Sequence, residues 1–204
     1  MCYSASSSFG TFFFVFIISC ILWIRGSNVQ KSLAIMLIII ASMQVIEGLL
    51  WLNIECNNVN KFITLFIAIL LFLQPIVIIG AVYAFGAGRL PPLFYKILLG
   101  ISLVSLPLYM DYFKDGLGKC TVIGENGHLV WPFTNITPIS LGQILYNTTI
   151  SIGFATLNTE WYGIFYVIMA TLGFFKTRIT YGHSWGSIWC HFVNLLAIGA
   201  LFVR

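Results

Sequence analysis

The chain has 204 residues, of which 59% are hydrophobic and 8% are charged, whereas a soluble domain usually has about 25% charged residues. This composition excludes an ordinary soluble globular domain and indicates an integral membrane protein. The net charge of +4 comes from ten scattered Lys and Arg residues, without the polybasic run or the basic patch with interleaved aromatic residues that nucleic-acid binding needs. We therefore expect the lipid bilayer as the main partner of the chain, and no nucleic acid.

Seven apolar segments that could cross a bilayer follow one another along the chain, because about 20 apolar residues span the hydrocarbon core. They are residues 9–24, 32–53, 62–85, 93–110, 138–157, 161–175 and 185–203. The sequence predicts an all-α, multi-pass (polytopic) membrane protein. Residues 1–204 form a single transmembrane helical bundle with the N-terminus outside.

The number of spans stays open between seven and six, because the fifth segment contains several polar residues. With seven spans the Lys and Arg residues divide evenly between the two sides, whereas six spans move Lys176 and Arg178 inside and satisfy the positive-inside rule better. The cysteines favour seven spans, because four of the five then lie at or near the outer face. These four are Cys2, Cys56, Cys120 and Cys190.

Four cysteines on an oxidising side are typical of one or two disulfides, and all four can pair in three ways. The alternative is that they are unpaired, small apolar residues. Cys20 lies apart from them, within the first segment.

The one sizeable loop covers residues 111–137 and contains two short β-type runs around Asn126-Gly127. This dipeptide is preferred in type I′ hairpin turns. We expect a small outer hairpin that caps the bundle. Asn135 begins a glycosylation sequon on the same side, usable only in a eukaryotic secretory pathway.

Polar residues within the apolar segments recur at helical spacing, which places each set on one helix face. The sets are Gln44, Glu47 and Trp51 in the second segment, Ser140, Gln143, Asn147 and Ser151 in the fifth, and Ser187, His191 and Asn194 in the last. The third segment adds Gln74 next to Pro75, where a kink and a freed backbone carbonyl are expected. Polar groups in a membrane usually face the bundle interior, so we expect these faces to meet there and never to contact lipid.

The depth of three polar residues in the membrane supports seven spans. Glu47 and His191 each lie six residues from the outer end of their segments, about 9 Å at 1.5 Å per residue, and Gln143 lies five residues from its own. In the seven-span arrangement the three side chains share one layer, where Glu47 meets Gln143, His191 or both. Such a layer could bind or relay protons, or it could be structural, with Glu47 hydrogen-bonded between helices.

Three fragments carry a resemblance to a known family: Met1-Cys2-Tyr3-Ser4-Ala5, Glu47 with Trp51, and Ser187-Ile188-Trp189-Cys190. Together they resemble an uncharacterised family of small seven-helix membrane proteins in bacteria and viruses. The resemblance implies seven helices with the N-terminus outside. It also implies a functional group at the outer mouth, formed by Cys2, Ser4, Glu47, Trp189 and Cys190. His191 is not part of the family pattern.

Three functions remain open from the sequence. The first is an outward-facing polar pocket that binds or conducts a proton, a cation or a small polar ligand. The second is a structural or assembly subunit whose outer face is tied by disulfides, and the third is a membrane-embedded hydrolase that uses Cys2 or Cys190 with His191 and Glu47. A homo-oligomer is also open.

We predict no cofactor and no metal. No lysine lies in the middle of a segment, so a retinal Schiff base has no attachment point. His191 is the one histidine within a segment, so a haem with two histidine ligands lacks its second ligand.

Overall fold

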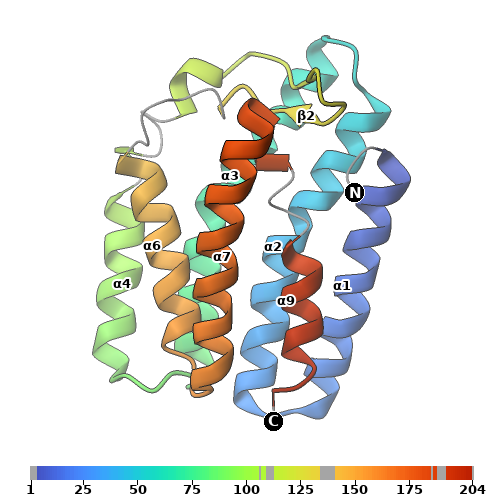
Figure 1. Cartoon of the computed structure of the whole chain (residues 1–204). Coiled ribbons are helices and arrows are strands. Elements are labelled where there is room, and N and C mark those ends of the chain that lie inside the picture. Colours follow the sequence, from blue (N-terminus) through green and yellow to red (C-terminus); the bar gives the residue numbers. More distant parts are fainter. Residues whose placement is uncertain are drawn as a thin grey trace.

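The computed structural model describes residues 4–105, 107–108, 113–133, 141–184, 186–187 and 192–203. Seven α-helices are defined in this part of the chain, and they run up and down side by side (Figure 1). They are α1 (Ala5–Arg25), α2 (Asn28–Leu52), α3 (Asn58–Ala84), α4 (Pro92–Val104), α6 (Leu141–Ala155), α7 (Glu160–Tyr181) and α9 (Phe192–Ala200). The N-terminal end of α1 and the C-terminus of the chain lie at opposite ends of the molecule (Figure 1).

Three helices, α1, α2 and α3, are long and apolar enough to cross a membrane, and α4 is a shorter apolar helix. Large apolar side chains also cover the outside of the molecule, with Ile24 and Ile179 each 83% exposed. An exterior of this kind is expected where lipid, and not water, surrounds the helices. The coarse prediction of a helical membrane protein therefore agrees with the structure, while the number of spans stays a prediction.

α1, α2 and α3 each begin four residues before their predicted apolar segments, because polar capping residues set their first turns. The Ser4 hydroxyl accepts a hydrogen bond from the Ser7 backbone N–H at 3.3 Å and begins α1. Gly26, with a φ of 84°, ends the helix in the left-handed region, which glycine adopts without steric cost. Ser27 and Gln30 then form a capping box that begins α2.

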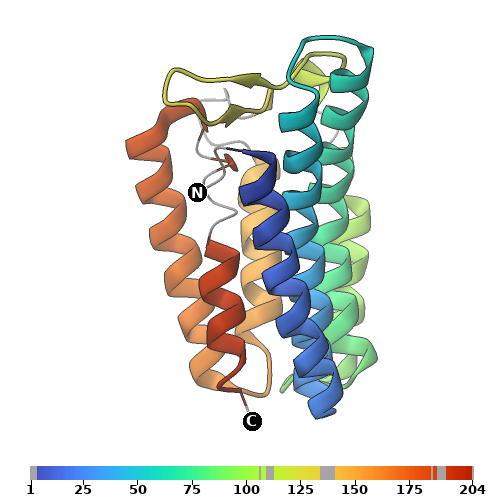
Figure 2. The same cartoon turned by 90° about the vertical axis from the view of Figure 1, so that its right-hand side faces the viewer.

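The last helix differs most from its predicted segment, because only the nine residues of α9 are helical in the described part of residues 185–203. α9 lies beside α1, α2 and α7 in the half of the molecule nearer the C-terminus (Figure 2). α2 also packs against α1 and α3, and α3 packs against α4 and α6. α3 continues through Pro75 without interruption.

The predicted hairpin is present, but its predicted turn is wrong. β1 (Val122–Ile123) pairs with β2 (Leu129–Val130) in antiparallel register. No described non-glycine residue has a positive φ, so Asn126 cannot supply the first residue of a type I′ turn. Instead, the Gly127 N–H donates to the Gly124 carbonyl at 2.9 Å and Gly127 has a φ of 74°, as in three-residue loops that end in a left-handed glycine.

The hairpin reaches across one end of the helices, from the α2–α3 connection to the end of α7 (Figure 2). There Asn126 donates to the Tyr181 carbonyl at 3.3 Å and accepts from the Ser184 hydroxyl at 2.9 Å. Ser184 belongs to a short 3-10 helix, η2 (Gly182–Ser184). His128 in the hairpin is only 1% exposed, and its ring lies edge-on to that of Tyr181, with ring centroids 5.7 Å apart.

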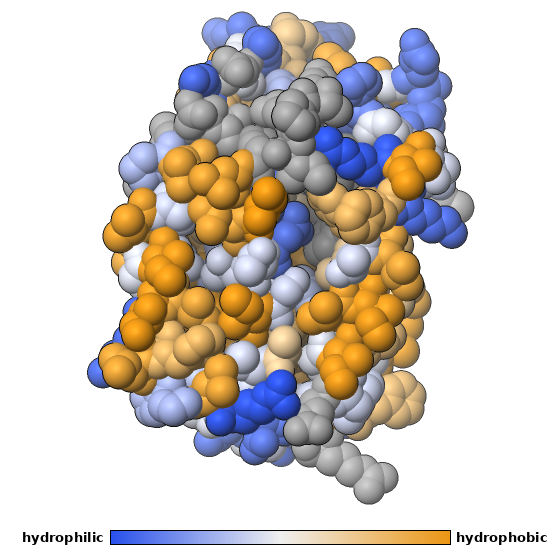
Figure 3. All heavy atoms as spheres, turned by 60° about the vertical axis from the view of Figure 1, so that its left-hand side comes forward, coloured by the Kyte–Doolittle hydropathy of each residue, from blue (hydrophilic) through white to orange (hydrophobic). Residues whose placement is uncertain are grey.

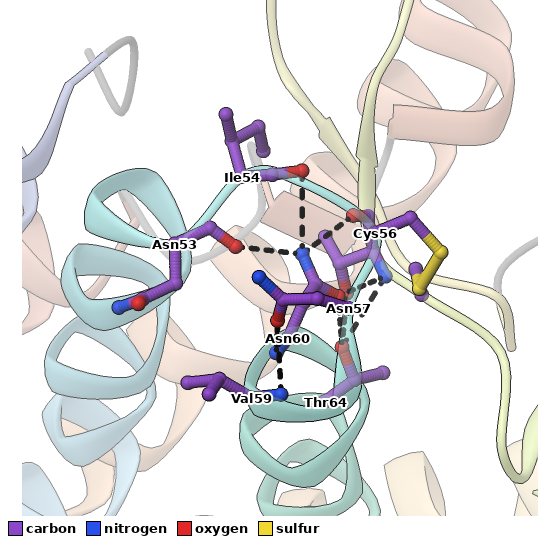
Figure 4. Close-up of a disulfide and its surroundings, with 9 residues drawn as sticks. Asn53, Ile54, Cys56, Asn57, Val59, Asn60 and Thr64 are labelled. Carbon is purple, nitrogen blue, oxygen red and sulfur yellow. Dashed lines mark hydrogen bonds between the residues drawn. A yellow bond between two sulfur atoms is a disulfide. The ribbon is translucent and has the colours of Figure 1, made fainter.

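A disulfide between Cys56 and Cys120 ties the root of the hairpin to the α2–α3 connection. Beside it, Asn60 is fully buried, and its amide oxygen accepts from the Thr121 N–H at 2.9 Å and from the Thr64 hydroxyl at 3.2 Å. The Asn60 amide nitrogen donates to the carbonyls of Asn53 and Thr121 at 2.9 and 3.1 Å (Figure 4). We call Asn60, Thr64 and Thr121 the hairpin anchor.

The disulfide confirms one pairing among the four predicted cysteines. Cys2 and Cys190 lie outside the described residues, as does the sequon at Asn135. Cys20 is free and exposed on α1.

The opposite end of the molecule has its own link between helix connections. Gly88, after α3, forms an isolated antiparallel bridge with Leu157, after α6. The Arg89 N–H donates to the Thr156 carbonyl at 2.9 Å, and the buried Tyr95 hydroxyl donates to the same carbonyl at 3.3 Å. Both ends of the helices are therefore fixed by hydrogen bonds between distant parts of the chain.

We predict that Asn60→Ala lowers the free energy of unfolding by about 1–3 kcal/mol, because it leaves buried backbone groups without their partner. The measurement is the unfolding midpoint in detergent, followed by circular dichroism. Asn58→Ala is the matched control, since Asn58 is exposed two residues earlier on the same helix. An equal effect of the two substitutions would contradict the anchor.

We also predict that the protein loses stability in acid through His128. Burial lowers the pKa of the His128 ring below its ordinary value of 6.5, so the unfolded chain binds a proton more readily than the folded one. The stability contributed by neutral His128 is present above pH 6.5 and is lost as the pH falls through the lowered folded-state pKa. As the pH falls from 8 to 4, the unfolding midpoint of His128→Gln should fall less than that of the wild type. The midpoint of His183→Gln, a substitution at an exposed position, should fall as much as that of the wild type.

Candidate functional site

The buried carboxyl group of Glu47 is the centre of the candidate site. Glu47 and Gln44 lie three residues apart on the inner face of α2, and both are fully buried. The Gln44 amide nitrogen donates to one carboxyl oxygen of Glu47 at 3.2 Å. The predicted shared face of these two residues is therefore observed, and it points into the protein.

The neighbouring glycine of Glu47 determines how closely α1 approaches. A Cβ atom at Gly48 would lie 2.7 Å from ring atoms of Phe9, so any larger residue there would force the Phe9 ring to move. Ser8, next to Phe9, therefore lies at about the level of Glu47. Ser8 is fully buried, and its hydroxyl has no hydrogen-bond partner among the described residues.

The last helix bonds to α1 at Thr11, one helical turn along from Ser8. The Asn194 amide nitrogen of α9 donates to the Thr11 hydroxyl of α1 at 3.4 Å, whereas the buried amide oxygen of Asn194 has no hydrogen-bond partner in the described part of the chain. α1, α2 and α9 all pack against one another. We call the polar residues between these helices the α1–α2–α9 layer: Ser8, Thr11, Gln44, Glu47 and Asn194.

Unbonded polar atoms are the chemically informative feature of this layer. A buried donor or acceptor without a partner costs about 1–3 kcal/mol, and such groups in native proteins need an explanation such as a bound water or ion. The Ser8 hydroxyl and the Asn194 amide oxygen are two such groups. Together with a carboxyl group they provide oxygen atoms, which suit a proton, a hydrated cation or a small polar ligand.

Gln74 does not join this layer in the structure. Its amide nitrogen donates to the Ile39 carbonyl of α2 at 3.3 Å, and its amide oxygen accepts a hydrogen bond from the Tyr146 hydroxyl of α6. Gln74 therefore connects three helices. Tyr146 was not predicted as a site residue, although it lies three residues after Gln143 and so shares its helix face.

Gln143 and Asn147 of α6 have different surroundings. Gln143 is 5% exposed, and its backbone carbonyl accepts from the Asn147 amide nitrogen at 3.0 Å. Asn147 lines a groove between α6 and α7, together with Thr148 and Ser151. The groove opens at the surface (Figure 3), and Asn147 and Ser151 are only half-buried, so the prediction that this polar face is enclosed by the bundle is wrong at these two residues.

The remaining predicted site residues have local roles or lie outside the described part. Ser4 caps α1, and its hydroxyl also lies 3.0 Å from that of Ser6. Trp51 is half-buried, and its indole N–H has no hydrogen-bond partner among the described residues. His191, Trp189, Cys2 and Cys190 lie outside the described residues, so their meeting with Glu47 stays a prediction.

No group of three or more His, Cys, Asp or Glu side chains that could hold a metal ion occurs within the described ranges. Comparisons of the chain with protein-family models, with curated proteins and with solved structures find no match. The resemblance to the seven-helix family therefore stays a prediction. The α1–α2–α9 layer is therefore the feature of this chain that indicates a function.

We predict that Gly48→Ala is destabilising by about 1–3 kcal/mol, because the added methyl group overlaps the Phe9 ring in a packed interface. Gly80→Ala is the matched control, since no atom lies within 4 Å of a Cβ at that helical position, and it should be neutral or slightly stabilising. Thermal unfolding in detergent measures both. Restoration of stability by adding Phe9→Leu to Gly48→Ala supports the contact, and an unchanged midpoint in Gly48→Ala contradicts it.

Proposed function

We propose that this chain is a multi-pass integral membrane protein whose α1–α2–α9 layer binds or conducts a proton or a small cation. The observation that carries the proposal is the fully buried carboxyl group of Glu47 on α2, a helix that packs against α1 and α9. Among the described residues, the buried Ser8 hydroxyl of α1 and the buried Asn194 amide oxygen of α9 have no hydrogen-bond partner. A carboxyl group inside a membrane is expensive, and it usually marks an ion or proton path.

The topology that we propose has seven spans with the hairpin end outside. A disulfide between Cys56 and Cys120 lies at this end, and disulfides form on the oxidising side of a membrane. α6 packs along α3 and α7, as expected for a segment that crosses with them. The opposite positions of α1's N-terminal end and the C-terminus (Figure 1) also agree with an odd number of crossings.

The chemistry of the layer suits a proton better than a multivalent metal. Glu47 contributes one carboxyl group, and the other polar groups there are neutral, so the layer holds at most one negative charge from its own residues. A divalent cation usually takes several carboxylate or carbonyl oxygens. A proton or a monovalent cation needs only this one charge and a chain of hydrogen-bonding groups.

A structural or assembly role is the second candidate function, and the hairpin anchor favours it. The disulfide and the Asn60 hydrogen bonds form a rigid outer cap, which is suited to holding a partner or another copy. In this case the Gln44–Glu47 hydrogen bond would only join polar groups within α2, and the ionisable carboxyl group would be dispensable.

We predict that Glu47→Gln abolishes proton or monovalent-cation flux in proteoliposomes, because the amide keeps the shape of the carboxyl group and the contact with Gln44 but cannot titrate. Flux across pH 5–8 should fall to the level of protein-free liposomes. Glu55→Gln is the matched control, since Glu55 is an exposed carboxylate on the α2–α3 connection, and it should conduct like the wild type.

Two outcomes would decide against the proposal. If wild type and Glu47→Gln conduct equally, the carboxyl group is not on the path. The second outcome is that neither protein conducts, that calorimetric titration detects no proton binding to either in this pH range, and that both unfold at the same temperature. The layer is then structural, and the assembly role is supported.

A further inference from the structure

A second polar site lies in the groove between α6 and α7. The groove has a volume of about 220 Å³. Figure 3 shows polar residues in a hollow, with apolar residues on both sides. Its polar side chains are Asn147, Thr148 and Ser151 from α6 and Thr171 from α7, and the aromatic rings of Phe174 and Phe175 line its α7 side. None of these residues belongs to the α1–α2–α9 layer.

The groove hydroxyls differ from most helical hydroxyls in this protein in their hydrogen bonding. Elsewhere a helical Ser or Thr hydroxyl commonly donates to the backbone carbonyl four residues earlier, as in Ser19, Ser42, Ser102 and Thr177. In the groove, the hydroxyls of Thr148, Ser151 and Thr171 have no hydrogen bond within the described residues. Asn147 uses its amide nitrogen on the Gln143 carbonyl, which leaves its amide oxygen for another donor.

The position of the groove makes these four groups costly in lipid. They lie near the middle of α6 and α7, away from both helix ends. In the seven-span topology proposed above, on which this inference rests, the bilayer offers no water to bond them there. The neighbouring surface is apolar, with Ile144 51% exposed and Phe175 53% exposed. A ligand that brings hydrogen-bonding groups into the hollow and apolar atoms onto its sides would remove this cost.

We propose that the α6–α7 groove binds an uncharged amphiphile with a hydroxyl-bearing head, of the chemical class of a monoacylglycerol. The head is uncharged because no lining residue of the groove carries a charge. The hydroxyls of the ligand meet Asn147, Thr148, Ser151 and Thr171, and its chain lies along Ile144 and the phenylalanine rings. The ligand enters sideways from the bilayer, since the groove is open on the lipid-facing surface.

A second copy of the chain fits the groove less well. In a two-fold contact this face would meet itself, and close helix approach in membranes depends on small residues at the point of contact. Here the bulky side chains of Ile144 and Phe175 stand exposed at the groove, and they have no hydrogen-bonding group to offer the hydroxyls.

The test uses a monoacylglycerol with a photoactivatable diazirine in its acyl chain, added to proteoliposomes of the full chain. We expect labelling of peptides from α6 and α7. Unlabelled monoacylglycerol should compete, whereas the fatty acid of the same chain length should compete at least about tenfold less well. The double variant Thr148→Val/Thr171→Val, which keeps side-chain shape, should reduce labelling about tenfold through two lost hydrogen bonds.

Two further variants keep the result interpretable. Thr148→Ser/Thr171→Ser retains the hydroxyls and should label like the wild type. Thr177→Val, on α7 but outside the groove, makes the same chemical change and should also leave labelling unchanged. Labelling that persists in the valine variant, or equal competition by the fatty acid, would overturn the proposal. It would also be overturned if nothing labels α6 and α7. A change of oligomeric state in the valine variant, measured by light scattering, would then assign the groove to a second copy of the chain.

Discussion

The scarcity of water around an apolar exterior is the constraint on which the rest of this structure depends. When lipid surrounds a bundle, each polar group must find its partner inside the protein. The hairpin anchor meets this demand completely at Asn60, whose amide group bonds partners from two helices and from the hairpin root. Such a satisfied network stabilises the fold and orients the hairpin, but it offers no hydrogen-bonding group to a ligand.

Two polar groups of the α1–α2–α9 layer follow the opposite pattern, whereas Gln74 of α3 is hydrogen-bonded to α2 and α6. The two ends are fixed, one by the anchor and its disulfide and the other by the bridge between Gly88 and Leu157. Between them, the buried oxygen atoms of Ser8 and Asn194, on the two helices that pack against α2, have no hydrogen-bond partner in the described part of the chain. A fold whose ends are rigid can hold such groups in place, because the helices cannot shift to cover them. The contrast separates structural polar residues from those that we assign to function.

Helical spacing allowed part of this arrangement to be predicted from the sequence. It placed Gln44 and Glu47 on one inward face of α2, and the turn residues located the hairpin. Spacing could not reveal the hairpin anchor, because Asn60 and Thr121 are 61 residues apart and meet only in the folded chain. It also could not fix the turn type, since Asn126 keeps a negative φ and Gly127 alone adopts the left-handed conformation.

The depth of a residue in the membrane could be counted along each segment, but the sequence could not show which helices pack side by side. Gln143 was expected beside Glu47 because the two are equally deep, yet α6 packs mainly against α3 and α7. The two-residue connection between α1 and α2 places these helices side by side, and the missing side chain of Gly48 admits the Phe9 ring between them. This glycine therefore affects how closely α1 covers the carboxyl group. The environment of Glu47 depends on α1 as much as on α2.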